Sequence, residues 1–123
     1  DELYLWLSNP IAIEYIRNCL KRVRKRDSAL MMASQNLEDF DQEGVREMTK
    51  PLFAIPPHQF LFNPGSIGKR FYMDMLQLDE AEFELIRHAR RGECLFKCGA
   101  ERYHLKVIAP DHKAVLFGTA GGK

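Results

Sequence analysis

A helical segment that runs directly into a short apolar segment constrains the fold of this chain most. Asn9 is placed to cap a helix that begins at Pro10, and the apolar residues that follow recur at helical spacing. Beyond the cationic end of this helix, the segment 28–34 is apolar and is too short for a helix of its own. A helix that leads into a buried strand is the second half of a β-α-β unit. The pattern therefore predicts an α/β fold with a mostly parallel sheet covered by helices.

The middle of the chain predicts two more helices and another strand. Residues 38–50 are polar and are expected to form a loop and a short helix that ends before Pro51, because proline disrupts a helix interior. His58–Phe62 is expected to form a buried strand that ends at the turn-forming residues after it. Residues 68–76 are expected to form the second helix.

The C-terminal third carries the clearest local signals. Asp79 and Glu82 have the spacing of a capping box at the start of a helix over residues 79–90. Residues 94–98 and 103–108 are expected to form the two strands of a β-hairpin, followed by a frayed tail. Aromatic residues on these elements and on the preceding strand are expected to lie in the core: Phe60, Phe62, Phe83 and Phe96.

Length and composition allow a single small domain or a portion of a larger one. The chain has 123 residues, of which 46% are hydrophobic, so it can bury a core. The net charge of +1 argues neither for nor against nucleic acid as a partner. An odd number of cysteines, 3, indicates reduced thiols in the cytosol, and no apolar run approaches the ~18 residues of a membrane span. The start at Asp1 without a methionine indicates a fragment or an excised segment, although a trimmed N-terminus would explain it as well.

Several short motifs follow one another in a distinctive order. Asp1 and Glu2 precede the basic helix, and the apolar segment 28–34 ends in Ser-Gln-Asn. The later motifs are HQFLFNP at 58–64, LDEAEFELI at 78–86 and RRGECLF at 90–96. In this order they resemble the type IV secretion ATPases of conjugative elements, the TraE/TrbE-like members of the FtsK–HerA class of RecA-like motors. Each motif is short, so the resemblance rests on their order and spacing along essentially the whole chain.

The resemblance implies that residues 1–123 are the C-terminal part of a RecA-like P-loop ATPase domain, with mostly parallel strands, helices and a terminal β-hairpin. The parent protein would use Mg-ATP and couple its hydrolysis to the transfer of DNA or protein during conjugation. It would act as a hexamer, together with other secretion-channel proteins, at the cytoplasmic face of the membrane. Because the chain contains no Walker A loop, we expect it not to hydrolyse ATP alone.

The same resemblance assigns roles to three polar residues. Asp1 would hold Mg²⁺ through water and Glu2 would act as the catalytic base, the two tasks of the acids that end a Walker B strand. Gln35 would sense the γ-phosphate, because ligands bind at the carboxyl ends of strands in open α/β sheets. The alternatives are two exposed acids at a chain end and a loop amide that caps the next helix.

Two pairs of arginines complete the expected site. Arg24 and Arg26 lie where related motors carry an arginine finger, whose guanidinium reaches the nucleotide of a neighbouring subunit. Arg90 and Arg91 match a motif near the C-terminus of the family and would act at a subunit interface or support the bound nucleotide. The alternative in both places is a helix end, where the helix dipole favours cations.

Two patterns imitate sites that we do not expect. The segment 65–69 (Gly-Ser-Ile-Gly-Lys) has two residues between its glycines where a P-loop has four, so it predicts a turn and a helix start. Cys94 and Cys98 lie in an expected strand without the spacing of a zinc knuckle, so zinc is not expected.

Two other classes of function stay open on the sequence alone. One is a small non-catalytic α/β interaction module, or regulator, that docks on a full-length motor. The other is a DNA-binding module that uses the cations of residues 17–26. The near-neutral net charge and the lack of interleaved aromatic residues weigh against DNA contact.

Overall fold

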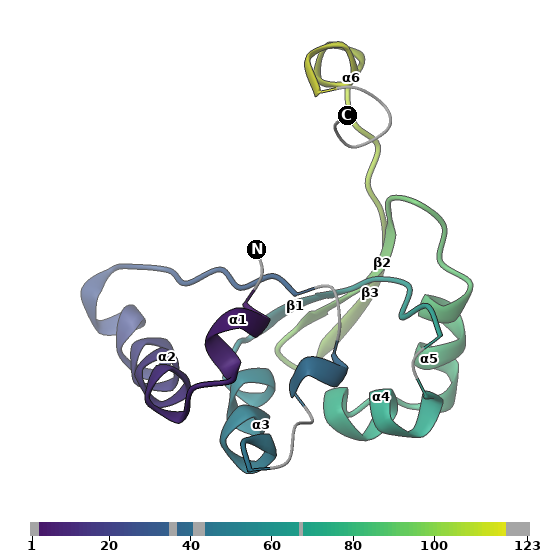
Figure 1. The fold of residues 1–123 in the computed structure, drawn as a ribbon. Coiled ribbons are helices and arrows are strands. Elements are labelled where there is room, and N and C mark those ends of the chain that lie inside the picture. Colours follow the sequence, from purple (N-terminus) through teal and green to yellow (C-terminus); the bar gives the residue numbers. More distant parts are fainter. Residues whose placement is uncertain (1–2, 35–36, 41–43, 67, 118–123) are drawn as a thin grey trace.

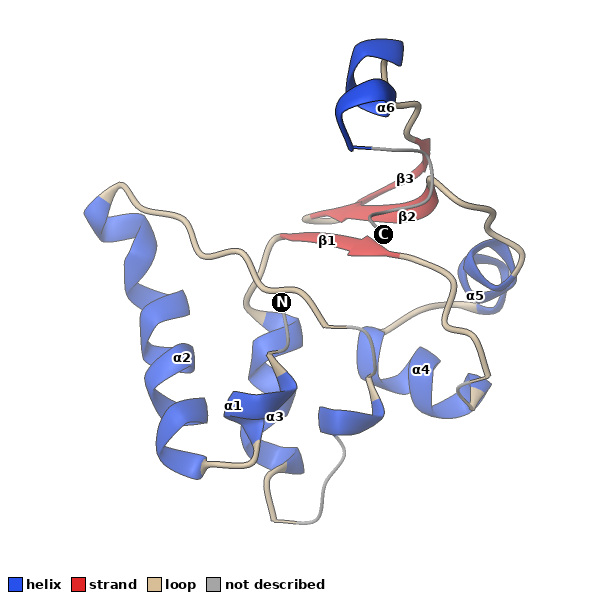
Figure 2. Ribbon diagram, turned by 45° about the horizontal axis from the view of Figure 1, so that its top comes forward, coloured by secondary structure: helices blue, strands red, loops and turns tan. Residues whose placement is uncertain are grey.

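A three-stranded antiparallel sheet lies at the centre of the fold, and most of the helices gather on one side of it (Figures 1 and 2). This computed structural model describes residues 3–34, 37–40, 44–66 and 68–117. Both strand pairings in the described residues are antiparallel, so the mostly parallel sheet expected from the sequence is not observed in them.

The N-terminal region is helical. It forms α1 (Tyr4–Leu7), α2 (Pro10–Arg22) and a 3-10 turn, η1 (Val23–Arg26). Asn9 caps α2 by accepting a hydrogen bond from the Ile11 N–H at 2.9 Å, and Pro10 occupies the first helical position. The predicted helix start is therefore confirmed.

The segment 28–34 is not a strand, and this prediction was wrong. It runs past α1 without regular secondary structure, and none of the described strands pairs with it (Figure 1). An extended segment without a neighbouring strand lacks partners for its backbone N–H and C=O groups, so apolar composition alone does not make a strand.

A second correction concerns α3 (Arg46–Ala54), which follows the 3-10 turn η2 (Glu38–Phe40) and contains Pro51. The expectation that this helix ends before the proline was wrong. Leu52 directly follows Pro51 and is buried, so packing outweighs the tendency of proline to break a helix. The apolar cluster that it joins spans the N-terminal half of the chain: Leu7, Ile13, Phe40, Val45 and Leu52.

The sheet has the strand order β1–β2–β3. Its strands are β1 (His58–Leu61), β2 (Glu93–Cys98) and β3 (Glu101–Lys106). The strands β2 and β3 form the expected hairpin, which turns at Gly99 with a φ of 59°. In the β1–β2 ladder, Phe60 lies opposite Phe96 and Leu61 lies opposite Leu95. The predicted strand and hairpin are therefore confirmed, although the strands differ from the expected ranges by up to two residues.

Two helices cover one face of this sheet. They are α4 (Lys69–Leu76) and α5 (Glu80–Arg87). The capping box at the start of α5 is confirmed, because the Glu82 N–H donates to Asp79 Oδ1 at 2.8 Å and the Asp79 N–H donates to Glu82 Oε2 at 3.0 Å. Side chains from both helices and from the sheet form the second apolar cluster: Leu61, Tyr72, Leu76, Leu78, Phe83, Ile86 and Leu95.

The opposite face of the sheet explains why two aromatic residues were placed wrongly. Phe60 is 54% exposed and Phe62 is 53% exposed, whereas Phe83 is buried as expected. Successive side chains of a strand point to opposite faces, so Leu61 faces the helices while Phe60 does not. Phe60 stacks on Phe96 at 4.5 Å between ring centroids, and Phe96 stacks on Tyr103 at 6.2 Å. These rings form an aromatic row on the face that α4 and α5 leave uncovered.

The C-terminal tail contains α6 (Asp111–Phe117), so the expectation of a frayed tail was wrong over this range. The helix projects from the sheet in both views, beyond the end of β3 (Figures 1 and 2). Among the described residues, no helix has the length and apolar character that a membrane crossing requires.

Candidate functional site

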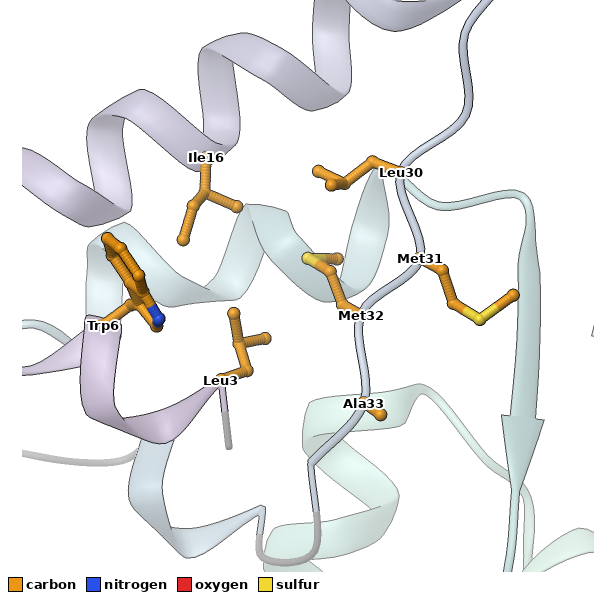
Figure 3. A pocket seen from close by; sticks show the side chains of 7 residues that line it. All are labelled: Leu3, Trp6, Ile16, Leu30, Met31, Met32 and Ala33. Atoms are coloured by element: carbon orange, nitrogen blue, oxygen red, sulfur yellow. The ribbon is translucent and has the colours of Figure 1, made fainter. Parts of the chain in front are cut away.

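A small apolar pocket lies between α1, α2 and the segment 28–34. Its volume is about 160 Å³ (Figure 3). The side chains that line it are all apolar: Leu3, Trp6, Ile16, Leu30, Met31, Met32 and Ala33. In Figure 3, Leu30 and Met32 point toward Leu3 and Ile16, whereas Met31 points away from them and is 95% exposed. Apolar side-chain contact therefore holds the N-terminal residues against the segment 28–34.

The pocket brings together the neighbours of three expected site residues. Leu3 directly follows Glu2, and Ala33 lies two positions before Gln35. Because Leu3 and Ala33 line the same pocket, the two segments that carry the expected site approach each other here. Asp1, Glu2 and Gln35 themselves lie outside the described residues, so their roles stay predictions.

Arg24 and Arg26 do not line this pocket. Both lie on η1, at the end of α2 farthest from α1 (Figures 1 and 2), and both side chains are exposed. Neither forms an ion pair with another described residue. An outward-facing guanidinium suits contact with a neighbouring subunit, and it equally suits a solvated helix end.

Arg90 and Arg91 lie in the turn between α5 and β2, and both are exposed. The Arg90 backbone N–H donates to Glu93 Oε2 at 2.9 Å, and this hydrogen bond is the main reason why the pKa of Glu93 is lowered. Gly92 has a φ of 82°, and a Cβ atom there would lie 2.6 Å from the Val107 carbonyl oxygen. Turn geometry therefore explains Gly92 and Glu93, while the two arginine side chains stay available for contacts.

Comparison with known proteins places the whole chain. No family model matches it. The chain is 28% identical over 126 residues to a probable conjugal transfer protein TrbE of Sinorhizobium fredii, covering 100% of this chain and 19% of that protein. It is 27% identical to the conjugal transfer protein TrbE of Rhizobium radiobacter, covering 100% of this chain and 15% of that protein. It is also 24% identical to the type IV secretion system protein CagE of Helicobacter pylori, over 90% of this chain and 12% of that protein.

A solved structure agrees with these relatives. The fold is similar to VirB4 of Thermoanaerobacter pseudethanolicus with a TM-score of 0.83 and 32% sequence identity, covering 92% of this chain and 31% of that chain. The chain belongs to the TrbE/VirB4-type proteins of type IV secretion. This confirms the resemblance drawn from the motif order. The chain spans less than a third of each of these relatives.

In this TrbE/VirB4-type chain, the lysine of the P-loop-like segment has a structural partner. Lys69 is the first residue of α4, as the predicted turn and helix start require. Its ammonium forms ion pairs with Glu80 and with Glu84, the latter at 3.3 Å, and lies 5.6 Å from the centroid of the Phe83 ring. The hydrogen bond to Glu80 is the main reason why the pKa of Lys69 is raised. Lys69 therefore joins α4 to α5.

A larger groove, which no motif indicated, lies between α3 and α4. Its volume is about 520 Å³. Its lining comes from the two helices, Gln77 and β2: Arg46, Lys50, Pro51, Phe53, Ala54, Phe71, Asp74, Met75, Leu76, Gln77 and Lys97. The sequence signal for this groove is Lys97, a lysine on the helix-covered face of β2 next to the buried Leu95 position.

Proposed function

We propose that this TrbE/VirB4-type chain forms the C-terminal part of a RecA-like ATPase domain, and that the protein couples ATP hydrolysis to the transfer of DNA or protein in conjugation. The observation that carries the proposal is the convergence of Leu3 and Ala33 on one pocket, within a fold similar to VirB4. This convergence supports a shared site for the acids before Leu3 and the amide after Ala33.

The chemistry of these side chains fits magnesium and a triphosphate. Carboxylate and amide oxygens are the donors that Mg²⁺ accepts in nucleotide sites, usually with water between the metal and some of them. In the proposal, Asp1 holds the metal through water, Glu2 accepts a proton from the attacking water and Gln35 donates its amide N–H toward the γ-phosphate. Mg-ATP supplies the reactive phosphoryl group when bound.

The exposed arginines support a site that is completed between subunits. We assign the finger to Arg24 or Arg26, which project from η1, and a supporting interface role to Arg90 and Arg91. In the proposal, the full-length protein assembles as a hexamer with other secretion-channel proteins at the cytoplasmic face of the membrane. DNA contact through the cations of η1 is a weaker element, because these residues lack neighbouring aromatic side chains.

Calorimetry with Mg-ATP tests the proposal. We expect no binding by this chain, and binding by a version extended N-terminally through the predicted P-loop. In the extended protein, Glu2→Gln should lower hydrolysis by about a hundredfold or more, because it removes the general base. Glu14→Gln is the matched control, an exposed acid on α2 whose replacement should leave hydrolysis unchanged. Turnover by the chain alone, or no binding by the extended version, would contradict the proposal.

The finger assignment has its own test. Arg26→Ala and Glu2→Gln should each be inactive in the extended protein, and mixing the two should restore some of the activity, because a finger acts on the neighbour's nucleotide. Arg24→Ala is tested in the same way, with Lys25→Ala as the control for lost charge on η1. If no mixture regains activity, neither arginine acts between subunits. If the extended protein binds no nucleotide at all, the interaction-module alternative is favoured.

A further inference from the structure

The groove between α3 and α4 has the size and composition of a ligand site. Its volume of about 520 Å³ lies within the roughly 300–1,000 Å³ that is typical of ligand pockets. Phe53 on α3 and Phe71 and Met75 on α4 supply apolar and aromatic surface. The groove is separate from the pocket that Leu3 lines, because the two share no lining residue.

The charged residues of the groove favour an anion. Three cations, Arg46, Lys50 and Lys97, line it with a single acid, Asp74. Lys50 is already paired with Glu47 at 2.6 Å, outside the lining. Opposite charge in a ligand would therefore be attracted to the groove by the remaining excess of positive charge.

Lys97 is the cation placed to make the strongest contact. Its ammonium donates a hydrogen bond to the Leu76 carbonyl oxygen at 2.6 Å and forms no ion pair with any described residue. Burial, and to a smaller extent the nearby Arg102, lower the pKa of Lys97, so its charge is under-compensated. An ammonium has three N–H donors, and a carboxylate that accepts a second one would offset the cost of burial.

A second unsatisfied group lies beside Lys97. Gln59 is its cross-strand partner on β1 and donates through Nε2 to the Phe53 carbonyl oxygen. Its Oε1 atom is buried and has no hydrogen-bond partner among the described residues. Two residues that Gln59 adjoins, Phe53 and Lys97, line the groove. A ligand that offers both carboxylates and N–H donors, as a peptide does, matches this surface better than a simple anion.

We propose that the α3–α4 groove binds a short acidic segment of a partner protein. One large apolar side chain of this segment lies among Phe53, Phe71 and Met75, and a neighbouring carboxylate pairs with Lys97. This is the helix-flanked groove mode of peptide recognition, in which apolar anchors supply affinity and charges supply orientation. The inference goes beyond the proposed function and does not depend on it, because the groove needs neither nucleotide nor a neighbouring subunit.

Fluorescence anisotropy with defined peptides tests the inference on the chain as it stands. The probe is a fluorescein-labelled peptide of sequence Asp-Glu-Phe-Leu-Glu, and its neutral counterpart is Asn-Gln-Phe-Leu-Gln. We expect the acidic peptide to bind at least about tenfold more tightly than the neutral one, with an affinity that falls as salt rises. Equal affinity for the two peptides, or no binding of the acidic one, would overturn the inference.

Variants place the binding in the groove. Lys97→Met should weaken the acidic peptide about tenfold or more and leave the neutral peptide little changed. Because Lys97 also contacts Leu76, a second variant, Phe71→Ala, removes an apolar wall and should weaken both peptides. Lys25→Met on η1 is the control and should change neither affinity. Unchanged binding in both groove variants, or displacement of the peptide by a single-stranded oligothymidine, would overturn the peptide assignment.

Discussion

The Lys69 ammonium lies 3.3 Å from the Glu84 carboxylate and joins the first residue of α4 to the middle of α5. The same ammonium pairs with Glu80, one turn earlier on α5. The hydrogen bond from Lys69 is the main reason why the pKa of Glu84 is lowered below its ordinary value of 4.5. The relative position of the two helices that cover the sheet therefore depends partly on charge.

Replacing Lys69 by methionine should flatten the acid response of the free energy of unfolding. Because the folded-state pKa of Glu84 is lowered, its charge contributes stability above the ordinary pKa of 4.5, and this contribution is lost as pH falls through the lower folded value. Urea denaturation of the wild type and Lys69→Met from pH 7 down to acid pH should show the smaller loss in the variant. The difference will be small, because these groups are solvent-exposed. Lys25→Met should follow the wild type, and parallel curves for Lys69→Met would contradict the prediction.

Gly92 is expected to be the glycine least tolerant of alanine. Its φ of 82° is left-handed, and a Cβ atom there would meet the Val107 carbonyl oxygen at 2.6 Å. Gly92→Ala should cost about 2 kcal/mol or more of the free energy of unfolding, from backbone strain and the clash together. Gly99→Ala is the matched control, since Gly99 has a φ of 59° but open space around it, and it should cost about 1 kcal/mol. Denaturant midpoints that fall equally in both variants would show that the contact with Val107 does not matter.

Thr49 should matter through its hydroxyl. This buried group lies 2.8 Å from the Phe40 carbonyl oxygen and 2.9 Å from that of Arg46, so it connects η2 to α3. Thr49→Val keeps the shape but removes the donor, and should cost about 1–3 kcal/mol in urea denaturation. Thr49→Ser keeps the donor and should retain more stability than the valine variant. A valine variant as stable as the wild type would rule out a contribution from the hydrogen bond.

The cap of α5 is expected to contribute measurably to stability. Asp79→Ala removes the acceptor for the Glu82 N–H and should destabilise the fold by about 1 kcal/mol. Asp79→Asn keeps an acceptor at the cap and should lose only some of this stability. Thermal denaturation followed by circular dichroism distinguishes the three proteins. If the alanine and asparagine variants melt together well below the wild type, the carboxylate charge, and not the hydrogen bond, carries the effect.

The expected site divides into residues that the motif order assigned and a groove that it did not indicate. The motif order alone was enough to recognise the TrbE/VirB4-type relationship, because each role in such a protein requires a particular residue type at a particular place along the chain. It did not indicate the α3–α4 groove. Lys97 joins Phe53 and Phe71 there only because β2, α3 and α4 pack together.

Local signals in the sequence determined the helix start at Asn9 and Pro10, the capping box of Asp79 and Glu82, and the hairpin, since each depends on hydrogen bonds between residues close in the chain. Tertiary structure decided what depended on distant partners. The segment 28–34 forms no strand because no described strand lies beside it, and Pro51 stays within α3 while its neighbour Leu52 is buried. Phe60 is exposed because the helices cover only the other face of its strand. A short apolar pattern records that a residue can be buried, but the neighbours that bury it come from elsewhere in the fold.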